Sequence, residues 1–95
     1  MITQVGDRLL VQGPVTIGTV SALLAQSRAL LAPGVAVLDF EGVTEVDSAA
    51  VALALECMRE ARRRKFALSL ANLPEAMQHL AELYAVSELL QADPA

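Results

Sequence analysis

The sequence predicts an α/β fold in which helices pack on a small mixed sheet of about four strands. Short apolar runs bounded by turn residues alternate along the chain with longer segments of helical periodicity. The run from residue 35 to 40, Val-Ala-Val-Leu-Asp-Phe, lies between two such helical segments. This order is typical of strand–helix–strand units, which join parallel neighbours through right-handed crossovers.

Composition indicates one well-filled domain, which we expect to span residues 1–95. Hydrophobic residues make up 55% of the 95 positions and charged residues 19%, which excludes a disordered, solvating chain. Aromatic residues make up only 3%, so the core must be aliphatic. An apolar fraction this high in a small domain favours a partner or self-association, so we include a homodimer among the expectations.

Charge and residue counts exclude several classes of protein. The net charge of −4 argues against a nucleic-acid binder, which usually carries excess positive charge. A single cysteine, Cys57, and a single histidine, His79, argue against an internal disulfide and a Cys/His metal site. Asp7 and Arg8 interrupt the N-terminal apolar pattern, unlike in a signal peptide. We therefore expect a cytoplasmic protein without metal or cofactor.

The chain opens with a predicted hairpin. Residues 2–5 and 8–12 read as short strands joined at Gly6-Asp7, and Gly13-Pro14 is expected to end the second strand.

The first predicted helix has Thr16 as its N-cap and stops at Pro33-Gly34. Its expected inner stripe consists of Ile17, Val20, Leu23, Leu24, Ser27, Leu30 and Leu31.

The middle of the chain is predicted as a buried strand over 35–40, a connection over 41–47 and a long helix over 49–64. Glu60 and Arg64 are spaced as an i, i+4 ion pair near the end of that helix. Its expected inner stripe consists of Val51, Leu55, Met58 and Ala61 or Arg62.

A further strand is predicted over 66–70, followed by a helix with Pro74 in its first turn and a last helical turn over 86–91. The apolar side of that helix consists of Met77, Leu80, Ala81 and Tyr84.

The segment Asp47-Ser48-Ala49-Ala50 is the candidate site. It follows a central strand and opens a helix, where open α/β sheets carry their ligands. Either Asp47 or Ser48 fits an N-cap, which is worth about 1 kcal/mol, and capping alone is the simpler interpretation. The functional alternative makes Ser48 a phosphoacceptor or a contact with a partner protein.

Other chemistry has little support. Ser48 lacks a Gly-x-Ser-x-Gly elbow, and His79 is expected to face solvent. The acids at 39, 41, 45 and 47 are expected around one loop, without the spacing of a calcium site. All five glycines are isolated, so nucleotide binding is not indicated. The basic run 62–65 is typical of a helix C-terminus, where the helix dipole favours positive charge; the alternative is that it contacts an anionic lipid or an acidic partner. Cys57 is expected to pack in the core.

Residues 35 to 91 resemble the STAS domain family, through "VAVLDFEGVTEVDSAAVALALECMREARRRKFALSLANL" and "HLAELYAVSELL". The likeness is greatest to the MlaB-type subunits of bacterial phospholipid-transporting ABC complexes. It implies a STAS-like fold and a non-enzymatic accessory subunit, at the cytoplasmic face of the membrane, that binds the transporter's MlaF-like ATPase. The implied partner-binding residues are Asp47, Ser48, Ala49 and Ala50.

The same resemblance implies an alternative, an anti-sigma factor antagonist controlled by phosphorylation of Ser48. The chain departs from both patterns after the hydroxyl, because Ala49 and Ala50 stand where the family usually has a glycine. Two alanines extend the helix rather than loosening its start.

Overall fold

The computed structural model describes residues 1–84, and the helical turn expected over 86–91 lies outside the described residues. In chain order the elements are β1 (Ile2–Val5), β2 (Arg8–Val15), α1 (Val20–Leu30), β3 (Val37–Val46), α2 (Ser48–Arg63), β4 (Ser69–Ala71) and α3 (Glu75–Leu83). None of the helices in residues 1–84 is long and apolar enough to cross a membrane.

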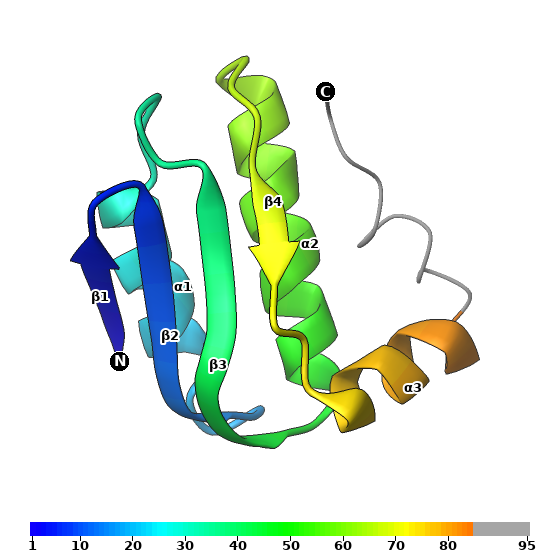
Figure 1. Cartoon of the computed structure of the whole chain (residues 1–95). Coiled ribbons are helices and arrows are strands. Elements are labelled where there is room, and N and C mark those ends of the chain that lie inside the picture. Colours follow the sequence, from blue (N-terminus) through cyan, green and yellow to red (C-terminus); the bar gives the residue numbers. More distant parts are fainter. Residues whose placement is uncertain (85–95) are drawn as a thin grey trace.

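One mixed sheet with strand order β1-β2-β3-β4 organises the molecule (Figure 1). The β1–β2 hairpin is antiparallel, whereas β2–β3 and β3–β4 are parallel pairs. The helices α1 and α2 lie side by side on one face of the sheet, and α3 follows the end of β4 (Figure 1). The predicted α/β class, the four strands and the parallel pairing are confirmed.

The core is aliphatic and lies between the sheet and the two helices. Alternate strand residues point into it, among them Leu9, Val11, Leu38 and Phe40, each no more than 1% exposed. From α2 the core receives Ala50, Val51, Leu53, Ala54, Cys57, Met58 and Ala61. The small side chains among these suit a close approach of helix and sheet.

The second strand is longer than the sequence predicted. Gly13 and Pro14 do not end β2, which continues to Val15 through two register irregularities against β3. Gln12 still exchanges hydrogen bonds with Met1, but beyond Gln12 the strand pairs with β3 alone. The N–H that Pro14 lacks is therefore not needed on the β1 side. Gly13 has a positive φ of 84°, which suits the irregular backbone at this point.

The third strand is also longer than the sequence predicted, because it pairs with the extended part of β2. Its partner extends, so β3 continues through residues 41–46, which were predicted as a connection. Gly42 lets the two strands come close, because a Cβ there would lie 3.2 Å from the Val11 carbonyl oxygen. The acids Glu41 and Glu45 therefore lie along a strand and not around one loop.

The first helix begins later than predicted. Residues 16–19 form a turn, in which the Thr16 carbonyl accepts hydrogen bonds from the N–H groups of Thr19 and Val20, both at 2.9 Å. The helix starts at Val20 with Thr19 at the cap position, so Thr16 is not its N-cap. Leu23, Ser27 and Leu31 are buried as expected, whereas Ile17 lies outside the helix and is 81% exposed.

The fourth strand is shorter than predicted. Pairing with β3 begins at Ser69 opposite Val37, and Phe66 instead closes the end of α2 by donating its N–H to the Ala61 carbonyl at 3.0 Å. In α3, Met77 and Ala81 are buried as predicted, but Tyr84 is 52% exposed.

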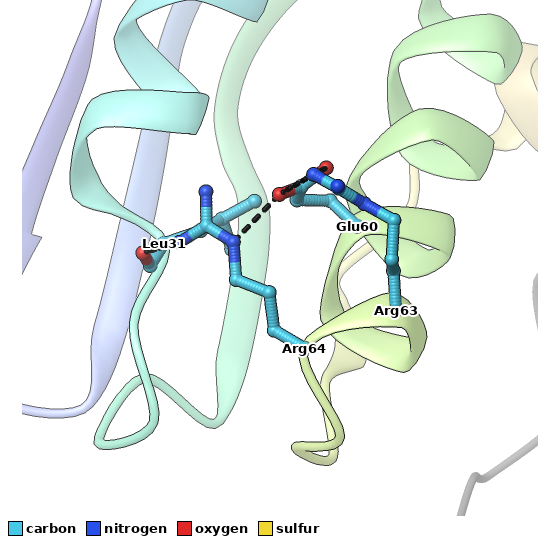
Figure 2. Close-up of polar contacts among 4 residues, drawn as sticks. All are labelled: Leu31, Glu60, Arg63 and Arg64. Carbon is cyan, nitrogen blue, oxygen red and sulfur yellow. Dashed lines mark hydrogen bonds and ion pairs between the residues drawn. The ribbon is translucent and has the colours of Figure 1, made fainter.

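The C-terminal ends of α1 and α2 are joined by arginine. Arg64 donates from Nη1 to the Leu31 carbonyl at the end of α1 (2.8 Å) and from Nε to Glu60 (2.6 Å), as Figure 2 shows. A cation at these termini satisfies exposed carbonyls and opposes the helix dipoles. The predicted Glu60–Arg64 pair is confirmed.

Candidate protein-binding site

Two loops meet at the carboxyl ends of β2 and β3. The first, residues 16–19, follows β2, and the second, Asp47-Ser48, joins β3 to α2. The N–H of Asp47 donates to the Val15 carbonyl at 3.3 Å, so the loops begin next to each other. This is the edge at which the sequence predicted the site.

The Asp47 carboxylate holds both loops. Its Oδ1 accepts from the Ala49 N–H at 2.8 Å and so caps α2, while its Oδ2 accepts from the Ile17 N–H at 3.0 Å. The predicted capping is therefore performed by Asp47, and the second bond joins residues thirty positions apart. Both carboxylate oxygens act within the protein, which fixes the positions of the neighbouring residues.

The first loop is fixed by its own side chain as well. The Thr19 hydroxyl accepts from the Thr16 N–H and donates to the Pro14 carbonyl, both at 2.9 Å. With Asp47 holding the Ile17 N–H, the loop is tied at both ends, and the Ile17 side chain points to solvent. The position of this exposed aliphatic side chain is thus set by a tightly bonded loop.

The four predicted site residues divide into two groups. Ser48 is exposed at the first position of α2, and Asp47 is half-buried. Ala49 is only 7% exposed and Ala50 is fully buried, so their side chains pack into the core of this chain. The exposed side chains nearest to the Asp47 carboxylate in the two loops are therefore those of Ser48, next to it in the chain, and Ile17, whose N–H it accepts.

The sequence analysis missed Ile17 because its spacing matched the apolar stripe of the following helix. A signal against that assignment was present in Gly18-Thr19, since a glycine followed by a capping residue favours a helix that starts after Thr19. A helix starting there leaves Ile17 in the preceding loop.

The histidine and the cysteine lie on other parts of the helices than Ser48. His79 is exposed on α3, 3.8 Å from Glu75. Cys57 is buried in α2, and burial raises the pKa of its thiol, although a hydrogen bond with Ser27 opposes the rise. Within residues 1–84, no three histidine, cysteine or acidic side chains come together in a way that could hold a metal ion.

Asp39 has a structural role on the sheet face that α1 and α2 do not cover. Its Oδ2 accepts from Arg8 in β2 at 2.7 Å, and its Oδ1 accepts from the Glu41 N–H and from Asn72 after β4, at 2.9 and 3.0 Å. Burial alone would raise the pKa of this carboxyl, but the bonds from Asn72, Glu41 and Arg8 together lower it. The carboxylate thus connects β3 with β2 and with the residue that follows β4.

This geometry defines a small α/β domain in which a serine at the start of α2 and an isoleucine of the loop after β2 are exposed at one edge of the sheet. The family model STAS_2, described as "Mlab, STAS domain", matches residues 2–91, and the chain belongs to this family. The STAS identity and the likeness to MlaB-type domains, both predicted from residues 35–91, are confirmed. STAS domains typically regulate and bind other proteins and are typically not enzymes.

Solved structures of other STAS-fold proteins are similar to the chain. The anti-sigma factor antagonist SpoIIAA in its unphosphorylated form superposes with a TM-score of 0.63 at 22% identity, over 87% of this chain and 81% of that one. A sulfate transporter family protein from Wolinella succinogenes superposes with a TM-score of 0.64 at 16% identity, over 87% and 69% of the two chains.

The structure of a third protein, Mglu, is similar with a TM-score of 0.56 at 24% identity. It covers 79% of this chain, which in turn spans only 19% of that protein. At these identities the three structures show a common fold. Comparison with curated protein sequences finds no match.

Proposed function

We propose that the chain is a non-enzymatic accessory subunit that binds the cytoplasmic ATPase of a phospholipid-transporting ABC complex through the Asp47-Ser48 loop and the start of α2. Membership in the MlaB-type STAS family supports this assignment. The observation that carries the choice of surface is the Asp47 carboxylate, which accepts from the Ile17 and Ala49 N–H groups and so ties the loop of Ile17 to the start of α2, where Ser48 is exposed.

Each residue of this segment then has a distinct role. The Ser48 hydroxyl supplies a hydrogen bond to the ATPase, and Ile17 adds apolar contact. Ala49 and Ala50 do not contact the partner directly, because they are buried and pack the first turn of α2 against the core. Association with the membrane is then indirect, through the complex.

The test replaces Ser48 with arginine and measures co-purification with the ABC ATPase encoded beside the chain's gene. Ser48 is exposed at the helix start, so the variant keeps its fold, checked by circular dichroism, but places a bulky cation in the interface. We expect the complex to be lost. Ser69→Arg is the matched control, since Ser69 is exposed on β4 at the opposite end of the sheet. Unchanged complex formation by Ser48→Arg would contradict the proposal.

A second function is favoured by the exposure of the Ser48 hydroxyl and by the fold shared with SpoIIAA. In this alternative the chain is an anti-sigma factor antagonist switched by phosphorylation of Ser48. A phosphate at the N-terminus of α2 would gain from the helix dipole but lie beside the Asp47 carboxylate. Incubation with ATP and a cognate anti-sigma kinase decides it, because an intact mass that gains no phosphate removes the mechanism.

A further inference from the structure

A groove with an apolar floor and a basic rim lies along the C-terminal half of α2. It consists of a cavity of about 380 Å³ between α2 and the chain leading into β4, and an adjoining hollow that shares Met58 and Arg62 with it. We call it the basic groove and define it by Met58, Ala61, Arg62, Lys65, Phe66 and Leu68. Its volume lies within the range of about 300–1,000 Å³ typical of ligand pockets.

The floor and rim differ in chemistry. Ala61 and Leu68 are buried at the floor, Met58 is 8% exposed, and the half-buried Phe66 packs against the same core. Arg62 and Lys65 are exposed at the rim. An occupant that satisfies both parts must combine an apolar side chain with negative charge.

The rim cations differ from their basic neighbours in how they are paired. Arg63 and Arg64 both donate to the Glu60 carboxylate (Figure 2), and Arg59 donates to Glu56 at 2.7 Å. Neither Arg62 nor Lys65 forms an ion pair with a carboxylate of residues 1–84. Their charge is therefore directed outward at the groove, whereas that of the neighbours is largely neutralised within α2.

The backbone at Lys65 is a second, independent observation. The end of α2 is a Schellman motif, in which the Lys65 N–H donates to the Arg62 carbonyl at 3.1 Å and the Phe66 N–H donates to the Ala61 carbonyl. Lys65 occupies its left-handed position with φ of 65°, where glycine is usual because other residues are strained there. This strained conformation holds a cation at the groove.

The place of the groove favours a polypeptide over a membrane. The groove is concave, and a flat lipid surface would not reach its floor. Residues 66–68 line it and lead into β4, the last strand of the sheet, whose outer edge pairs with no strand in residues 1–84. An extended segment laid there could bond to this backbone edge while one side chain enters the cavity.

From these features we propose that the basic groove is a docking site for an acidic polypeptide segment of a partner protein. An apolar side chain of the segment enters between Met58 and Phe66, and its carboxylates meet Arg62 and Lys65. The groove lies at the opposite end of α2 from Ser48, and the proposal does not depend on the function of the Asp47-Ser48 loop.

The test uses fluorescently labelled synthetic peptides of about eight residues, a usual strand length. One peptide alternates leucine and glutamate, a second alternates leucine and lysine, and a third alternates serine and glutamate. Fluorescence anisotropy with the full chain should show the leucine–glutamate peptide binding at least about tenfold more tightly than either control peptide. Equal binding of the leucine–lysine peptide would overturn the proposal.

Variants then locate the binding. Arg62→Glu reverses a rim charge and should weaken binding of the leucine–glutamate peptide by about tenfold or more, whereas Arg28→Glu, on α1 outside the groove, should not. Lys65→Gly removes the second cation at a position whose backbone suits glycine, so it tests charge without strain. An equal loss of peptide binding in Arg62→Glu and Arg28→Glu would refute the proposal. So would a full chain that binds vesicles of phosphatidylglycerol and phosphatidylcholine but does not bind the leucine–glutamate peptide.

Discussion

At the scale of single residues, Asp47 both caps α2 and fixes the loop that follows β2 against the start of this helix. A capping residue needs one carboxylate oxygen for the helix, and Asp47 uses the other for the Ile17 N–H of a different loop. The sequence predicted the capping, since an acid before an apolar helical pattern indicates an N-terminus. It could not predict the second bond, because nothing local relates Asp47 to a loop that only the sheet brings near.

Replacing Asp47 by alanine removes both bonds. We expect the free energy of unfolding to fall by about 1–2 kcal/mol, the cost of losing an N-cap together with a loop contact. Ser48→Ala should change it by less than about 0.5 kcal/mol, since Ser48 is exposed beside the cap. Urea denaturation measures both. If Ser48→Ala lowered the free energy of unfolding more than Asp47→Ala does, Asp47 would not be the residue that caps α2.

Among the secondary-structure elements, those whose bounds depend on local sequence signals were predicted best. α2 was predicted over 49–64 and spans Ser48–Arg63, because its apolar stripe, cap and charged end all agree. β2 and β3 were predicted too short, because their outer halves exist through mutual pairing, which irregularities at Gly13 and Gly42 permit. The Thr16–Thr19 turn was missed because its apolar residue continued the helical period.

The sheet itself carries a pH-dependent connection at Asp39. Its pKa lies below the ordinary value of 3.8, because the hydrogen bonds and the Arg8 charge outweigh the effect of burial. A carboxyl with a lowered pKa in the folded state contributes stability that is fully present above its unfolded value and is lost as the pH falls through the folded value. Asp39 therefore stabilises the sheet at neutral pH and ceases to do so in acid.

We expect Asp39→Asn to reduce the free energy of unfolding at neutral pH by about 1–3 kcal/mol, the usual effect of leaving buried polar groups poorly paired. The variant should also flatten the part of the acid-induced loss of stability between about pH 5 and pH 2 that this carboxyl causes. Urea denaturation across that range measures both effects. An unchanged pH profile in Asp39→Asn would show that other carboxyls dominate.

At the scale of the whole molecule, α2 separates two chemically different surfaces. Its N-terminus presents Ser48, next to the Asp47 carboxylate that accepts from the Ile17 N–H, and its C-terminal half presents the basic groove. Because a helix rises about 1.5 Å per residue, Ser48 and Arg62 lie about 21 Å apart along the axis. The helix between them is buried along its length against the sheet and α1, so the two surfaces are held at a fixed separation.

This separation predicts that the two surfaces act independently. Substitutions farther apart than about 7–10 Å without shared partners usually add, so Arg62→Glu should leave co-purification with the ATPase intact, and Ser48→Arg should leave peptide binding at the groove unchanged. The double variant should lose both. Pulldown and anisotropy on the same four preparations, wild type included, measure this directly. If Arg62→Glu alone also abolished the ATPase complex, the partner would extend along α2 and the two surfaces would form one interface.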